Sequence, residues 1–278
     1  MRFLDFSKPF CLATASTLTI WWGLFGAECF ASDWLTGGAF RDRLEDRVGL
    51  SWSNAPLRES LQKLGRTKHV AVLVDRRVDP GQRVSLSVDG VPLIDAVFEL
   101  ARQRDLEACL FGPVVYITPP ETGERLRTLA AVKTETLRKL PVDRRLRWMK
   151  AEPLKWPDFA VPRELVLELA RSSGISIEGI KRIPHDLWAA ADLPPMSLSD
   201  RLTLLLGQFD LTYEPGPGAD EVRLAPLPEE IGLVRSYMVR GATEPAVKQY
   251  SAAAPGAEFK VVGNKVYVRG LLADHERI

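Results

Sequence analysis

The sequence predicts an α+β fold of tandem small βαββαββ modules, with helices packed on one face of short mixed sheets, and a C-terminal βαββ(α) unit. Three observations predict this fold. The apolar rhythm of residues 57–106 matches that of residues 162–211 without a gap. In both copies, helical periodicity alternates with short strand patterns. A shorter pattern of the same kind follows at 231–278, and the composition, 46% hydrophobic and 26% charged, is that of a globular protein.

Residues 1–31 are laid out as a signal peptide. A weakly basic start precedes an uncharged, apolar stretch at 11–27, and small residues stand before a cut between Ala31 and Ser32. This pattern predicts export to the periplasm, with association with the outer membrane left open. The alternative is an uncleaved N-terminal anchor. The apolar stretch is at the short end of the lengths that can span a membrane, so it could still serve as one.

The first module is predicted over residues 46–120. Pro56 stands where a helix can begin without losing a hydrogen bond, and Gly65 is expected to end that helix. The β-branched run at 70–74 predicts a buried strand. The remaining expected elements are an alternating strand at 84–88, a second helix at 93–101 and a hairpin around Gly112-Pro113.

The second module is predicted over residues 151–228 and repeats this order. A helix from Pro162 to Ser173 precedes Gly174, and a strand follows at 175–177. The second helix is expected at 199–209, and the closing strands at 211–213 and 222–224.

Two further segments complete the predicted organisation. Residues 121–150 form a basic helical linker, with nine Lys or Arg between Arg125 and Lys150 against two acidic residues. Residues 231–278 form a third module, in which Gly263-Asn264 is the tight turn of a hairpin and Asp274 caps a short last helix. We expect this module to be incomplete, because one helix covers the apolar face of so small a sheet poorly.

The first module resembles the short N-terminal domain of secretins and TonB-dependent receptors, in the segments NAPLRESLQKLGRTKHVAVLVDRRV and VPLIDAVFELARQRDLEACLFGPVVYITP. The second copy, VPRELVLELARSSGISIEG followed by MSLSDRLTLLLGQFDLTYE, looks like a more diverged member. The tail YMVRGATEPAVKQYSAAAPGAEFKVVGNKVYVRGLLADHERI is similar to the start of a secretin N1-type βαββα module. The resemblance implies N-domains without the pore, plug or barrel that follows them in those families.

No catalytic, metal-binding or cofactor-binding residue is predicted. Ser60 and Lys63 have the S-x-x-K spacing of penicillin-binding enzymes, but the other motifs of that chemistry are missing. The three histidines fall in different modules and are expected to have surface or capping roles, while Cys109 is expected to be buried and inert. Nucleic-acid binding is not expected, because the net charge is +1 and no G-x-x-G loop joins two helices.

Two groups of residues are candidates for contacts. The basic residues of the linker could meet an acidic partner, lipid head groups or cell-wall carboxylates: Arg138, Lys139, Arg144, Arg145 and Arg147. Trp148 and Trp156 could stack on a glycan or a partner. The competing interpretations are a solvated connector helix for the basic residues and core anchors for the two tryptophans.

These features favour an exported, non-enzymatic protein of the cell envelope. We expect it to mediate protein–protein interaction or self-assembly, accessory to a secretion or outer-membrane transport system, because small modules with exposed strand edges suit β-augmentation and ring stacking. The expected partners are envelope proteins or further copies of the chain. The alternative is a periplasmic protein that binds peptidoglycan or another cell-wall glycan.

Overall fold

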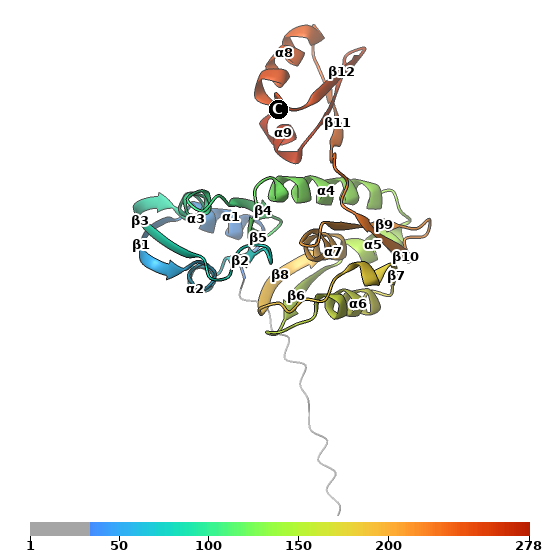
Figure 1. The fold of residues 1–278 in the computed structure, drawn as a ribbon. Helices are drawn as coiled ribbons and strands as arrows, with labels where there is room; N and C mark the ends of the chain where they lie inside the picture. Colours follow the sequence, from blue (N-terminus) through green and yellow to red (C-terminus); the bar gives the residue numbers. More distant parts are fainter. Residues whose placement is uncertain (1–33) are drawn as a thin grey trace, which may run out of the picture. The chain divides into compact units, whose positions relative to one another are not determined.

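The computed structural model describes residues 34–278 and contains helices and several small mixed sheets (Figure 1), which confirms the α+β class. The predicted signal peptide and its cut between Ala31 and Ser32 lie outside the described residues. Within residues 34–278, none of the helices combines the length and the apolar character that crossing a bilayer requires.

The first module contains two sheets. β1 pairs with β3 in one antiparallel sheet, and β2 lies parallel to β5 in a second sheet of order β2-β5-β4. An unpredicted helix, α1, precedes them. The elements are α1 (Gly37–Glu45), β1 (Arg47–Pro56), α2 (Leu57–Lys68), β2 (Ala71–Val74), β3 (Arg83–Pro92), α3 (Leu93–Arg102), β4 (Glu107–Phe111) and β5 (Val114–Thr118).

The second module repeats this topology strand for strand. β6 pairs with β8, and β7 lies parallel to β10 in a sheet of order β7-β10-β9. The gap-free alignment places α7 residue on residue with α3. The repeat in the sequence is therefore a repeat in topology. The elements are β6 (Ala151–Trp156), α6 (Pro162–Ser172), β7 (Ser176–Glu178), the 3-10 turn η1 (Ile180–Arg182), β8 (Ala191–Ser197), α7 (Leu198–Gly207), β9 (Leu211–Pro215) and β10 (Glu221–Pro226).

Gly65 does not end α2, contrary to the prediction. The helix continues to Lys68 and ends at His69, which adopts the left-handed conformation with φ of 56°. A Cβ atom at position 65 would lie 2.6 Å from the carbonyl oxygen of Val70. Glycine is needed there because the chain entering β2 passes directly against the helix.

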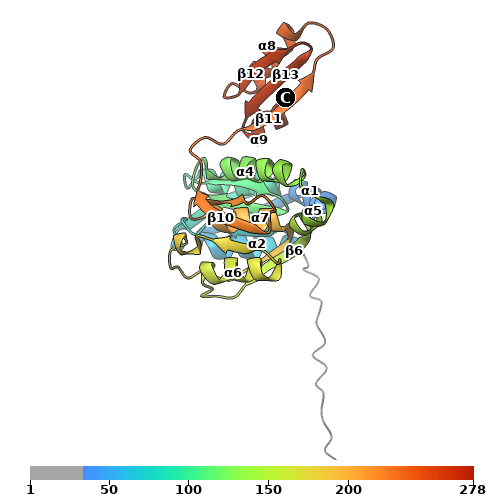
Figure 2. The ribbon, with the colours of Figure 1, turned by 90° about the vertical axis from the view of Figure 1, so that its right-hand side faces the viewer.

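The predicted linker is part of the core. It forms α4 (Thr122–Leu137) and α5 (Val142–Met149), and α4 lies against α7, β4 and β5 (Figures 1 and 2). Leu126, Leu129 and Trp148 are buried in one cluster with side chains from the β2-β5-β4 sheet and from α7. The first two modules therefore share a continuous core and are not separate units on a string.

Cys109 belongs to this core. The thiol is buried and forms no disulfide among the described residues, as predicted. Burial raises its pKa, which keeps the sulfur protonated and unreactive.

The third module is a βαββα unit, with β11 (Leu233–Met238), α8 (Thr243–Ala253), β12 (Glu258–Val262), β13 (Lys265–Gly270) and α9 (Leu272–Arg277). Asp274 accepts a hydrogen bond from the backbone N–H of Leu271 at 2.8 Å, so the predicted cap is present. α9 lies where the sequence predicted the short last helix, so a second helix follows α8 in this module. His275 is buried, bonding to the hydroxyl of Tyr237 and the carbonyl of Leu233, which corrects its predicted surface role.

Candidate functional site

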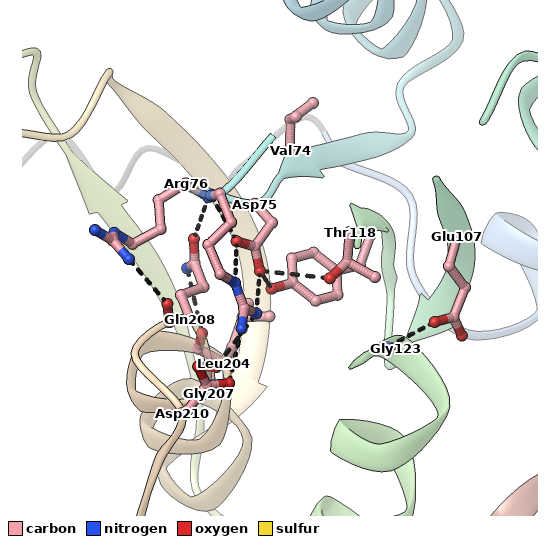
Figure 3. Close-up of polar contacts among 12 residues, drawn as sticks. Val74, Asp75, Arg76, Glu107, Thr118, Gly123, Leu204, Gly207, Gln208 and Asp210 are labelled. Atoms are coloured by element: carbon pink, nitrogen blue, oxygen red, sulfur yellow. Dashed lines mark hydrogen bonds and ion pairs between the residues drawn. The ribbon is translucent and has the colours of Figure 1, made fainter. Parts of the chain in front are cut away.

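A buried polar cluster joins the first two modules. Asp75, directly after β2, is fully buried, and both its oxygens are occupied (Figure 3). Arg77 donates to the carboxylate through its side chain at 2.9 Å and through its backbone N–H at 2.8 Å. The hydroxyls of Tyr116 and Thr118 donate to it as well. Burial and then the charge of Asp75 raise the pKa of Tyr116, so the phenol stays protonated as the donor.

The arginines of this cluster reach into the second module. Arg77 donates to a carboxylate oxygen of Asp210 at 2.8 Å, and the backbone N–H of Arg76 donates to the side chain of Gln208 at 3.0 Å. Burial disfavours the charged guanidinium of Arg77, but its bonds to Asp75 outweigh this and raise the pKa. Because the carboxylate is fully hydrogen-bonded, the cluster serves to fasten the modules together.

A groove opens beside this cluster, which we call the inter-module groove. Its volume is about 1030 Å³, and it lies between α2 and β2 on one side and the segment 186–192 on the other. Trp156 and Trp188 contribute to its walls, and the exposed side chain of Leu187 contributes to its lining. Arg58 and Arg66 line the side formed by α2.

Arg58 differs in its surroundings from the other arginines of the groove. It is half-buried, and its guanidinium reaches only the carbonyl oxygens of Val74 and Asp75, at 3.4 and 3.5 Å. Among residues 34–278, no carboxylate forms an ion pair with it. Burial lowers its pKa, and the charge of nearby Asp75 opposes that effect. A desolvated cation without a paired anion is a candidate for ligand binding.

A second, smaller hollow of about 570 Å³ is rich in carboxylates and includes Glu107 and Glu124. Glu107 accepts a hydrogen bond at 3.0 Å from the backbone N–H of Gly123 (Figure 3) and a second one at 3.0 Å from that of Glu124, at the start of α4. Burial raises the pKa of Glu107, and these bonds oppose the shift. Glu107 thus caps α4. In the described part of the chain, no three His, Cys, Asp or Glu side chains are placed to hold a metal ion.

The two predicted stacking residues are core anchors, so the stacking interpretation is wrong. Trp148 is fully buried, donates its indole N–H to the carbonyl of Ala219 at 2.9 Å and stacks on Tyr213. Trp156 is buried as well and donates to the carbonyl of Ala189 at 2.8 Å. Both side chains are thus almost wholly buried, with at most 3% of their surface exposed.

The five basic candidates divide into two groups. Arg144 and Arg147 both pair with Asp220, so they tie α5 to the loop before β10. Arg138 and Lys139 are exposed, and Arg145 is half-exposed. None of these last three forms an ion pair within residues 34–278, so only they remain available for an electrostatic contact.

Sequence reasoning missed the cluster and the groove, although parts of the signal were visible. Asp75 follows a buried β-branched strand directly, and Arg58 aligns with Arg163 in the repeat. What the sequence did not reveal is that the loop after β2 meets the end of α7.

No protein-family model matches the chain, and a search of curated proteins finds no match either. The resemblance to secretin and TonB-type N-domains therefore rests on the residue patterns of the sequence alone.

Proposed function

We propose that the protein is an exported, non-enzymatic cell-envelope protein built of secretin/TonB-type N-domains, which mediates protein–protein interaction or self-assembly, accessory to a secretion or outer-membrane transport system. One observation carries the proposal. The third module exposes apolar side chains on both edge strands of its sheet: Val234 (54%) and Met238 (65%) on β11, and Val262 (53%) on β12.

These side chains share the face of the sheet opposite to the helices. Val266 and Val268 of β13 are buried on the side where α8 and α9 pack. Side chains alternate along a strand, and directly opposed residues share a face. The register pairs Val234 with Arg269, and it pairs both Met238 and Val262 with Lys265. All three apolar side chains therefore lie on the open face. Exposed apolar side chains on two unpaired edge strands are typical of an interaction surface.

The test compares the purified mature protein with Met238→Lys and Val262→Lys. Sedimentation velocity measures self-association, and co-purification from envelope extracts measures binding to other proteins. We expect each lysine to reduce whichever association the wild type shows, because a charge on the buried face of an interface is costly. The matched control is Phe98→Lys on α3, a similarly exposed apolar side chain (40%) in the first module.

Two results would contradict this proposal. One is a wild-type protein that stays monomeric and captures no envelope protein. The other is an association that Phe98→Lys weakens as much as the third-module variants do.

The glycan-binding alternative keeps one supporting observation. Arg138, Lys139 and Arg145 lie near the exposed apolar side chains Val142 and Leu146 of α5 in the sequence. If this surface binds cell-wall carboxylates, the triple change Arg138→Glu, Lys139→Glu and Arg145→Glu should abolish sedimentation with purified peptidoglycan. Arg144 and Arg147 stay unchanged, because their loss would disturb the contact with Asp220.

A further inference from the structure

We propose that one end of the third module inserts into the surface of an anionic lipid bilayer. This end, which we call the hairpin tip, comprises residues 238–240 at the end of β11 and residues 260–265 around the turn between β12 and β13. The inference goes beyond the proposed function, because a bilayer covers side chains that a protein docked on the open face of the sheet does not reach.

The strand register gathers apolar side chains at the hairpin tip. Lys265, directly after the turn, pairs with Met238 on one side and with Val262 on the other, so these two exposed side chains flank the same residue. The backbone N–H of Val239 donates to the carbonyl of Asn264 at 2.9 Å. The chain that leaves β11 therefore stays beside the turn, and both segments form one end of the sheet.

Exposed apolar side chains occur on both faces of the sheet at this end. Val262 lies on the open face, whereas Val261 pairs with the buried Val266 and so lies on the side of the helices. Val261 is nonetheless 45% exposed, so the helices leave this part of their side uncovered. A protein docked on the open face would leave Val261 in water. A bilayer surrounds a protruding tip and covers both valines at once.

The hairpin tip is basic and contains no acidic residue. Arg240, Lys260 and Lys265 are exposed, and none of them forms an ion pair within residues 34–278. The nearest carboxylates along the chain belong to Glu258, which forms an ion pair of its own, and to Glu244 in α8. The net charge of this end is therefore positive, even when Glu244 is counted.

Unpaired cations around exposed apolar side chains select an anionic lipid surface. The lipid phosphates attract the cations, while the apolar side chains enter the boundary between the headgroups and the acyl chains. An apolar protein partner would satisfy the valines and Met238 but would leave the three cations without anions.

The hairpin tip lies at the free end of the sheet. β11 begins at Leu233, which pairs with Gly270, and the connection from β10 arrives and α9 begins at that end. From Leu233 to Met238 the strand extends roughly 17 Å. The turn can therefore reach a bilayer that the connection to the second module does not touch.

The experiment measures binding of the purified mature protein to vesicles of phosphatidylcholine alone or mixed with the anionic phosphatidylglycerol. Flotation gives the bound fraction. We expect binding to the mixed vesicles only, and we expect it to weaken as salt screens the charges. Val262→Glu should weaken this binding at least about tenfold, because burial of the valine is lost. Lys260→Gln and Lys265→Gln together should weaken it about twentyfold.

Val234→Glu is the matched control. Val234 is exposed to the same extent as Val262 and lies on the same face, at the other end of the sheet. We expect this variant to bind the mixed vesicles within about twofold of the wild type, because position 234 lies outside the inserted tip.

A fluorescent label tests whether the tip enters the bilayer. Cys109 is buried, so Asn264→Cys places the accessible thiol of the described chain at the turn, where it takes an environment-sensitive dye. The emission of this dye should shift to the blue on anionic vesicles. The same dye at Ser236→Cys, in the middle of β11, should shift little. Equal shifts at both positions would mean that the sheet lies flat on the lipid, which overturns insertion of the tip.

The proposal is also overturned if anionic vesicles are not bound, or if Val262→Glu and the paired lysine changes leave binding unchanged while circular dichroism shows an intact fold. Val261→Glu separates this proposal from the proposed function. It should weaken vesicle binding and spare protein association through the open face, whereas Val234→Glu should do the reverse. If Val261→Glu weakens self-association and the wild type binds no vesicles, the hairpin tip is a protein contact.

Discussion

The first two modules have the same topology but use their second helices differently. α3 is amphipathic: Leu93, Val97 and Leu100 are buried, and Phe98 on the other side is exposed. In α7, at the aligned position, every residue except Asp200 is buried. The difference arises because α4 and the end of the first module cover the outer side of α7. The second helix of the repeat therefore lies at the surface in the first module and at the centre in the second.

The junction itself is built from residues that the repeat does not share. Asp75 aligns with Ile180, so the buried polar cluster has no counterpart in the second module. Gly207 aligns with Arg102, which is 79% exposed at the end of α3. At position 207, a Cβ atom would lie 2.4 Å from the side chain of Leu126. Modules of common topology have thus diverged where they meet.

Removing the carboxylate of the polar cluster should have the largest effect on stability. Asp75→Ala leaves the buried hydroxyl of Tyr116 without its acceptor and Arg77 without its buried carboxylate partner. We expect the free energy of unfolding to fall by about 3–5 kcal/mol, the usual cost of removing one partner of a buried pair. Urea unfolding followed by circular dichroism and tryptophan fluorescence measures the change.

Ile180→Ala is the control at the aligned position. Ile180 is half-buried and apolar, so its truncation should cost about 1 kcal/mol. Equal losses for the two variants would show that the polar cluster contributes nothing beyond ordinary packing.

Filling the contact between α7 and α4 should have an intermediate effect. Gly207→Val places a branched side chain where Leu126 already lies, and Leu126 is fully buried. Overpacking of this kind costs about 1–3 kcal/mol. Arg102→Val introduces the same side chain at the aligned surface position and should change the free energy of unfolding by less than about 0.5 kcal/mol. If both variants unfold at the same urea concentration, α4 does not pack tightly on α7 in solution.

The sequence predicted the order of elements well because that order is encoded locally. Apolar spacing such as Leu57, Leu61 and Leu64 determines a helix whatever surrounds it. The end of α2 was misplaced because Gly65 is required by the close passage of Val70, which is a tertiary contact. The run Leu204-Leu205-Leu206 covers several sides of α7 and was the available signal that this helix is buried all round.

The candidate sites were much less predictable than the elements. For Trp148 the sequence left two interpretations open, a contact residue and a core anchor; the structure packs it on Tyr213, from a strand far along the chain. Arg144 and Arg147 form ion pairs with Asp220, more than seventy residues away. Periodicity reports which side of an element is apolar, but it does not report which distant element covers that side.

The smallest predicted effect concerns the carboxylate of Asp200. Burial raises the pKa of Asp200, and the hydrogen bond from Ser197 at 2.7 Å opposes the shift. A carboxyl group with a raised pKa binds protons more tightly in the folded state than in the unfolded state. Its contribution to stability therefore falls as the pH rises from the unfolded pKa, about 3.9, through the folded pKa, and the loss is complete above that value.

Asp200→Asn removes this titration while keeping a side-chain acceptor for the hydroxyl of Ser197. The quantity to measure is the free energy of unfolding of the wild type minus that of the variant. We expect this difference to decrease by less than about 1 kcal/mol as the pH rises from about 3 to about 6. A difference that does not decrease over this range would mean that Asp200 is not buried in solution, which would weaken the contrast between α7 and the amphipathic α3.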